Sequence, residues 1–98
     1  MNINTEKNGE KLTIALEGRL DTTTAPQLEK VIEEKSEGIT EMTIDMTKLE
    51  YISSAGLRVL LSTHKKMSKI GILKITGVCD EIMDVFEMTG FSDILNIE

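Results

Sequence analysis

Several residue types that often carry chemistry are scarce in this 98-residue sequence. It has no tryptophan and only one each of cysteine, histidine and proline. The lone Cys79 excludes an internal disulfide and fits a reducing compartment. One histidine and one cysteine cannot make a zinc site without several carboxylates. Ser54 and His64 are separated by most of three helical turns, too far for the hydrogen bond of a catalytic pair. We therefore expect no catalytic residues, no metal and no cofactor.

Long apolar runs are also absent. No stretch approaches the ~20 apolar residues that a membrane-spanning helix needs, and the polar residues 1–6 do not resemble a signal peptide. The glycine-rich phosphate loops of nucleotide-binding proteins and the nucleophile elbow of hydrolases are missing as well. We therefore predict a cytoplasmic protein without membrane insertion.

Charge is distributed unevenly along the chain. The net charge of −6 argues against direct binding of nucleic acid, which relies on Lys and Arg. Residues 51–79 nevertheless contain no acidic residue, while they contain five basic ones: Arg58, Lys65, Lys66, Lys69 and Lys74. We favour a solvated face that complements a helix C-terminus over a docking surface for an acidic partner. Arg58 lies close to Ser54 in sequence.

The pattern of apolar residues predicts alternating strands and helices in one domain, residues 1–98. We expect strands at 2–6, at 11–17 with Gly18 ending the second, at 39–46, at 71–77 and at 94–97. We expect helices at 24–36, from Ser53 or Ser54 to about residue 70, and at 80–89. Thr24 and Gln27 fit a capping box at the first helix, and Asn8-Gly9 fits a hairpin turn.

This order predicts an α/β fold with a mixed, mostly parallel sheet of four to five strands. Strand–helix alternation gives parallel strands, and the Asn8-Gly9 hairpin adds an antiparallel pair at the start. The second strand alternates apolar and polar residues, which favours helices packed mainly on one face.

The organising stretch is a strand-to-helix turn at Ser53-Ser54. Serine is a preferred N-cap residue, so one hydroxyl can simply cap the helix. A second, adjacent hydroxyl would then be exposed, where backbone N–H groups and the helix dipole favour a phosphate group. Two serines side by side allow both roles.

Three segments resemble the STAS family, which contains the anti-sigma factor antagonists and the cytoplasmic domains of sulfate transporters. They are DMTKLEYISSAGL at residues 45–57, GRLDTTTA at residues 18–25 and FEMTGF at residues 86–91. They occur in the order and spacing of the family and together span nearly the whole chain. The sequence departs from the commonest form of the family at Ser53, where Asp is usual, and at Ala55, where Ser or Thr is usual.

The resemblance implies a regulatory binding module rather than an enzyme. Its unphosphorylated form would capture a serine/threonine kinase that acts as an anti-sigma factor, and so release a sigma factor. Phosphorylation of Ser54, with Ser53 as the alternative, would block capture, and a serine phosphatase would reverse it. The partner-binding residues implied are Asp21, Thr22, Ser53, Ser54, Gly56 and Arg58.

Two other functions stay open at this point. One is a STAS module of a lipid-transport or sensory complex, without a phosphorylation switch and with Ser54 as a cap only. The other function is a small enzyme or nucleotide binder that uses the helix N-terminus as an anion site. The missing glycine loop argues against it.

Asp21 also has two interpretations. It can contact the partner, or it can be a loop residue that hydrogen-bonds its own backbone.

Overall fold

Five strands and three α-helices make up the fold in a computed structural model that describes residues 1–98. In chain order the elements are β1 (Asn2–Asn8), β2 (Lys11–Leu20), α1 (Ala25–Lys35), β3 (Glu41–Ile52), α2 (Ser54–Met67), β4 (Ile72–Thr76), α3 (Asp80–Thr89), the 3₁₀ turn η1 (Phe91–Asp93) and β5 (Asn96–Ile97). The predicted order of strands and helices is confirmed. None of the helices is long and apolar enough to cross a membrane.

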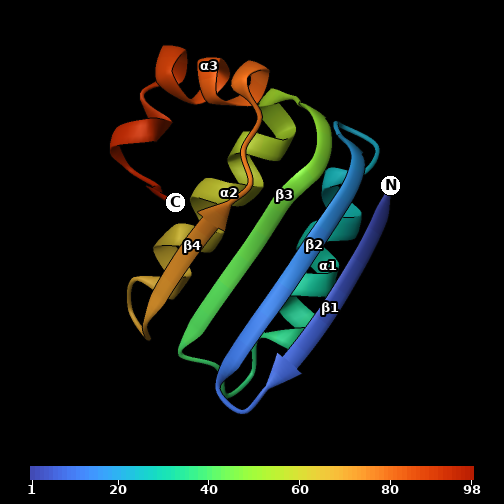
Figure 1. The fold of residues 1–98 in the computed structure, drawn as a ribbon. Coiled ribbons are helices and arrows are strands. Elements are labelled where there is room, and N and C mark those ends of the chain that lie inside the picture. Colours follow the sequence, from blue (N-terminus) through green and yellow to red (C-terminus); the bar gives the residue numbers. More distant parts are fainter.

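The strands lie in the sheet in the same order as in the chain, β1-β2-β3-β4-β5. β1 pairs with β2 in an antiparallel hairpin, and the other three pairs are parallel. Helices α1 and α2 cover the same face of this sheet, whereas α3 lies beyond its upper end (Figure 1). The prediction of a mixed, mostly parallel sheet with helices mainly on one face is therefore confirmed.

The core lies between the sheet and the helices. Alternate residues of β2, such as Ile14 and Leu16, are fully buried and meet Leu28 of α1 and Leu60 of α2 in one apolar cluster. The opposite face of the sheet is polar and carries ion pairs, the shortest of which joins Lys74 Nζ to Glu41 Oε1 at 3.4 Å. One dry face and one polar face follow directly from the period of two in the strands.

Three strands run further than predicted, beginning with β1, which continues to Asn8. β2 does not end at Gly18 but continues to Leu20, which is fully buried. Gly18 has a φ of +109°, and the pairing with β3 shifts register between Gly18 and Arg19. A glycine at a bulge lets the strand pass through a kink that other residues rarely adopt. β3 likewise continues beyond Met46 to Ile52.

Helix ends differ from the predictions in two places. The Thr24 side chain does not cap α1: its Oγ1 accepts a hydrogen bond from Asp21 N at 2.8 Å and donates one to Arg19 O at 2.8 Å. Helix α2 ends at Met67 rather than near residue 70, although the helical spacing of apolar residues extends to Ile70, which is 54% exposed. Leu61, another residue of that spacing, is only half-buried. The predicted end of α3 at residue 89 is confirmed, and Gly90 follows it in the left-handed conformation.

Candidate functional site: the strand-to-helix turn at Ser53-Ser54

Two segments that are far apart in sequence meet at the upper end of the sheet (Figure 1). β2 and β3 are parallel neighbours, and their last residues, Leu20 and Ile52, pair with each other. The following residue, Ser53, donates its backbone N–H to Leu20 O at 2.9 Å. The loop that begins at Asp21 and the turn at Ser53-Ser54 therefore leave the sheet side by side.

The two serines of the turn have different surroundings. Ser53 occupies the N-cap position of α2 in an extended conformation, but its side chain makes no capping hydrogen bond. Its Oγ is buried and has no hydrogen-bond partner. Ser54, the first residue of α2, is exposed. The expected free hydroxyl is thus that of Ser54, whereas the expected cap by the Ser53 side chain is not formed.

The start of α2 also presents free backbone donors. The first intrahelical hydrogen bond runs from Leu57 N to Ser53 O at 3.0 Å. The N–H groups of the three residues between them therefore precede the hydrogen-bond ladder of the helix. Together with the positive end of the helix dipole, they favour negative charge beside the Ser54 hydroxyl.

Gly56 has a packing role. It is buried, and an added Cβ would lie 2.7 Å from Leu20 Cγ and 2.9 Å from Ile52 Cγ1. Real Cβ atoms do not approach other atoms so closely, so glycine lets α2 lie directly against the ends of β2 and β3. This burial moves Gly56, predicted as a partner-binding residue, away from the surface that a partner could contact.

Asp21 organises the neighbouring loop. Its Oδ1 accepts hydrogen bonds from the Thr23 hydroxyl at 2.8 Å and from the backbone N–H groups of Thr23 and Thr24 at 3.0 and 3.1 Å. The hydroxyl bond from Thr23 is the main cause that lowers the pKa of Asp21, with the backbone bonds adding to it and burial opposing it. Asp21 therefore does hydrogen-bond its own loop. Its neighbour Thr22 is exposed.

The structure brings two of the remaining predicted residues together. Thr22 and Arg58 line one hollow, along with Ala55 and Pro26. Arg58 is exposed and lies one helical turn after Ser54. This hollow, between the loop after β2 and the first turns of α2, lies beside Ser54, whose neighbour Ala55 lines it.

One feature beside this surface was missed from the sequence. The guanidinium of Arg19 lies 4.1 Å above the ring of Tyr51, the only tyrosine of the chain. The two residues pair across β2 and β3, one residue before the strands end. An alternation pattern could have placed each on the polar face, but only the shifted register makes them neighbours.

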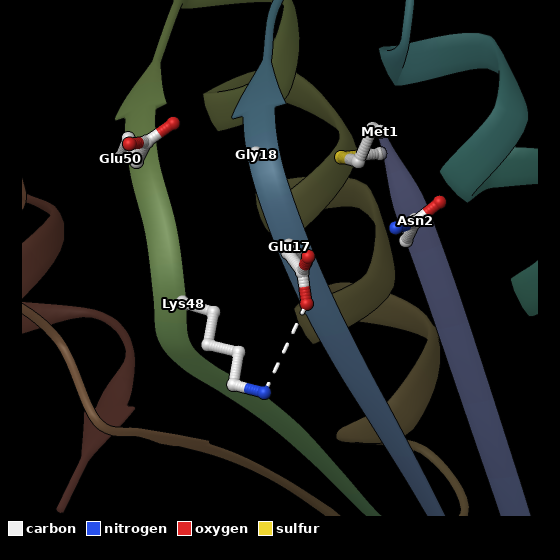
Figure 2. A pocket seen from close by; sticks show the side chains of 6 residues that line it. All are labelled: Met1, Asn2, Glu17, Gly18, Lys48 and Glu50. Atoms are coloured by element: carbon white, nitrogen blue, oxygen red, sulfur yellow. Dashed lines mark ion pairs between the residues drawn. The ribbon is translucent and has the colours of Figure 1, made fainter.

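A separate hollow lies on the open face of the sheet, beside the bulge in β2. Figure 2 shows Glu17 and Lys48 on neighbouring strands, their ion pair drawn as a dashed line, with Met1 and Glu50 nearby. This hollow contains none of the predicted site residues. No group of three or more His, Cys, Asp or Glu side chains gathers in the molecule as a metal site would require.

The sequential mixed sheet, its one-sided helices and the serine turn define an α/β domain of a kind that known proteins share. Residues 2–98 match the STAS domain, and the chain therefore belongs to the STAS domain family. The anti-sigma-B factor antagonist of Listeria monocytogenes is 33% identical over 96 residues, covering 95% of this chain and 83% of that protein.

Solved structures agree with this assignment of the fold. An anti-sigma factor antagonist from Mycobacterium paratuberculosis superposes with a TM-score of 0.88 at 22% identity, covering 98% of this chain and 83% of the other. The Bacillus cell fate determinant SpoIIAA in its phosphorylated form gives a TM-score of 0.77 at 18% identity, covering 99% and 91%. The fold predicted from the three motifs is confirmed.

Proposed function

We propose that this chain is an anti-sigma factor antagonist, a binding module whose capture of a serine-kinase anti-sigma factor is switched off by phosphorylation of Ser54. The observation that carries the proposal is the difference between the two serines: Ser54 is exposed at the start of α2, and Ser53 Oγ is enclosed. A kinase must reach the hydroxyl that it phosphorylates.

Similarity to named proteins supports the same function. The Listeria relative is an anti-sigma-B factor antagonist, and SpoIIAA exists in a phosphorylated form. The proposal makes the chain a regulatory protein rather than an enzyme. It also places the chain in the cytoplasm, where the sigma factor, the kinase and the phosphatase that would remove the phosphate act.

The local electrostatics explain how the switch would work. A phosphate group adds about −1.5 to −2 charges and three acceptor oxygens. At the start of α2 the free N–H groups and the helix dipole tolerate this charge, so the fold is kept. In a docking surface the same charge must lose water and meets partner groups that fitted a neutral hydroxyl. Capture is therefore lost without unfolding.

The test is a phosphorylation assay with the purified anti-sigma factor kinase and ATP, read by mass spectrometry of the intact chain and its peptides. We expect one phosphate on the wild type and none on Ser54→Ala, which should still bind the kinase. Ser53→Ala is the matched control and should keep most of the phosphorylation.

Two results would change the proposal. Phosphorylation of Ser54→Ala with its loss in Ser53→Ala would move the site by one residue. A wild-type chain that neither binds the kinase nor accepts phosphate would instead indicate a STAS module of a different assembly.

A further inference from the structure

Four basic side chains of one surface strip have no acidic partner. Arg58, Lys65, Lys66 and Lys69 are all exposed, and none of them forms an ion pair. They line one hollow on the outer side of α2, together with the half-buried Leu61 and the exposed Ile70. We call this surface the α2 basic hollow.

The lysines on the open face of the sheet do have acidic partners, whereas Lys30 and Lys35 of α1 form no ion pair. On the open face of the sheet, Lys11, Lys48 and Lys74 all lie within 4.0 Å of a glutamate oxygen. The chain carries 17 acidic residues, so partners are plentiful, yet none lies in residues 51–79. Like charges kept together without counter-charges repel one another in the folded chain.

The helix dipole accounts for only part of this cluster. Cations are favourable within the last turn of a helix, which explains Lys65 and Lys66. Arg58 lies in the second turn, near the positive end, where a cation gains nothing from the dipole. Lys69 lies in the turn that closes the helix, where its N–H bonds Lys66 O, so the dipole favours it too. A solvated face that complements the C-terminus, the interpretation favoured from the sequence, therefore leaves Arg58 unexplained.

The α2 basic hollow adjoins a second hollow near the start of α2. Arg58 and Ser62 line both this hollow and the one that contains Thr22 and Ala55, the residue after Ser54. That neighbouring hollow also contains Glu29 of α1, which sets an acidic border on the side toward α1. A partner seated on Ser54 can therefore extend along α2 toward Ile70 without crossing another element.

The shape and charge of the hollow favour a protein segment over a lipid surface. Its cations flank two apolar side chains, which suits an amphipathic segment with acidic residues on either side of an apolar stripe. The whole chain has a net charge of −6 and would be repelled from an anionic bilayer. A short acidic segment responds mainly to charges within about one Debye length, ~8–10 Å, and so to the hollow alone.

We infer that the α2 basic hollow docks an acidic, amphipathic segment of the partner protein, the same protein that the Ser54 surface captures. This rests on the proposed function and extends it, because it gives the partner a second contact that phosphate on Ser54 does not touch. The hollow would set the rate of encounter and the choice of partner, as complementary charges do at other interfaces.

The first test is the affinity of the purified anti-sigma factor kinase for Lys65→Glu/Lys69→Glu, measured by calorimetry at about 50 and about 300 mM NaCl. We expect binding at low salt to weaken at least about tenfold, and the loss to shrink at high salt. The matched control is Lys30→Glu/Lys35→Glu on α1, which changes the net charge equally at exposed positions. It should bind within about twofold of the wild type, because surface charges away from the interface contribute little.

A second test does not depend on the proposed function. An amide NMR titration would use a synthetic helical peptide with glutamates flanking a leucine stripe. We expect shifts confined to residues 58–70, and none with the same peptide carrying glutamine in place of glutamate.

Three outcomes would overturn the inference. They are equal binding of the kinase by both double variants, peptide shifts spread over the whole chain, and sedimentation with phosphatidylserine vesicles that Lys65→Glu/Lys69→Glu abolishes. Failure of the kinase to bind even the wild type would instead refute the proposed function, and the peptide titration would still decide the hollow.

Discussion

At the scale of single residues, the site depends on contacts that the type of residue does not reveal. Ser53 and Ser54 are chemically identical neighbours, but one hydroxyl is enclosed and the other is free. The difference arises because Ser53 N–H is bound to Leu20 O, which fixes the turn against the end of β2. A motif can therefore predict the turn, whereas the packing against β2 determines which serine is exposed.

Gly56 gives a direct test of that packing. Gly56→Ala places a methyl group 2.7 Å from Leu20 Cγ, so α2 or Leu20 must move. Overpacking typically costs ~1–3 kcal/mol, and the better helix propensity of alanine returns at most about 1 kcal/mol. We expect a net loss of roughly 1–2 kcal/mol in urea unfolding. Ser62→Ala, an exposed change in the same helix, should stay within about 0.5 kcal/mol.

Two aspartates should titrate at unusually low pH. The Thr23 hydroxyl lowers the pKa of Asp21, and the Thr47 hydroxyl, 2.6 Å from Asp45 Oδ1, does the same for Asp45. Because the folded pKa is lowered, the stabilisation is present above the unfolded pKa of about 3.9 and is lost as pH falls through the folded value.

The measurement is an NMR titration of the two carboxyl carbons. Thr47→Val should raise the pKa of Asp45 toward its ordinary value and leave that of Asp21 unchanged. Thr23→Val should raise the pKa of Asp21 and leave that of Asp45 unchanged. Parallel shifts of both aspartates in either variant would mean a global change rather than these local hydrogen bonds.

At the scale of elements, α2 carries both the candidate site and a large part of the core. Leu60 is fully buried, so Leu60→Ala should lower the free energy of unfolding by ~2–5 kcal/mol. Leu61 is half-buried at the α2 basic hollow, and Leu61→Ala should cost distinctly less, because less apolar area leaves water there. Equal losses in chemical denaturation would contradict the orientation of the helix.

The sequence predicted which elements exist better than where they end. Alternation in β2 and helical spacing in α2 are local signals, and both predicted the right element, although α2 ends at Met67 rather than near residue 70. The continuation of β2 beyond Gly18 is not local, because it depends on a bulge that re-forms the pairing with β3. The absence of a cap by Thr24 has the same origin. The Thr24 hydroxyl hydrogen-bonds Arg19 O and Asp21 N, at the end of that longer strand, instead of the helix backbone.

The candidate site was predictable to the extent that it lies within one segment. Ser54 and Arg58 are one helical turn apart, so spacing alone places them together. The neighbourhood of Thr22, and the stacking of Arg19 on Tyr51, depend on the parallel register of β2 and β3. Periodicity predicts on which face of the sheet a residue lies, but not which residue of the neighbouring strand pairs with it.

At the scale of the whole molecule, the proposed switch should alter binding without altering the fold. Ser54→Asp puts a negative charge at the start of α2, where the dipole favours it. We expect thermal unfolding close to that of the wild type and clearly weaker binding of the kinase. Asn8→Asp, at an exposed position beside the β1–β2 turn and outside both hollows of α2, is the control for added charge. Equal binding by Ser54→Asp and the wild type would argue against the switch.

The order of strands in the sheet has a consequence for how the chain acquires its structure. Because each strand pairs with the one before it in the sequence, no strand waits for a distant segment to close a gap. Only the β1–β2 hairpin closes a short loop, whereas each later strand pairs in parallel across an intervening helix, a slower step. The sheet can therefore grow in chain order, with β3 added to the hairpin before β4 and β5. The turn at Ser53-Ser54 depends only on the pairing of β2 with β3, so it can form before the C-terminal elements are added.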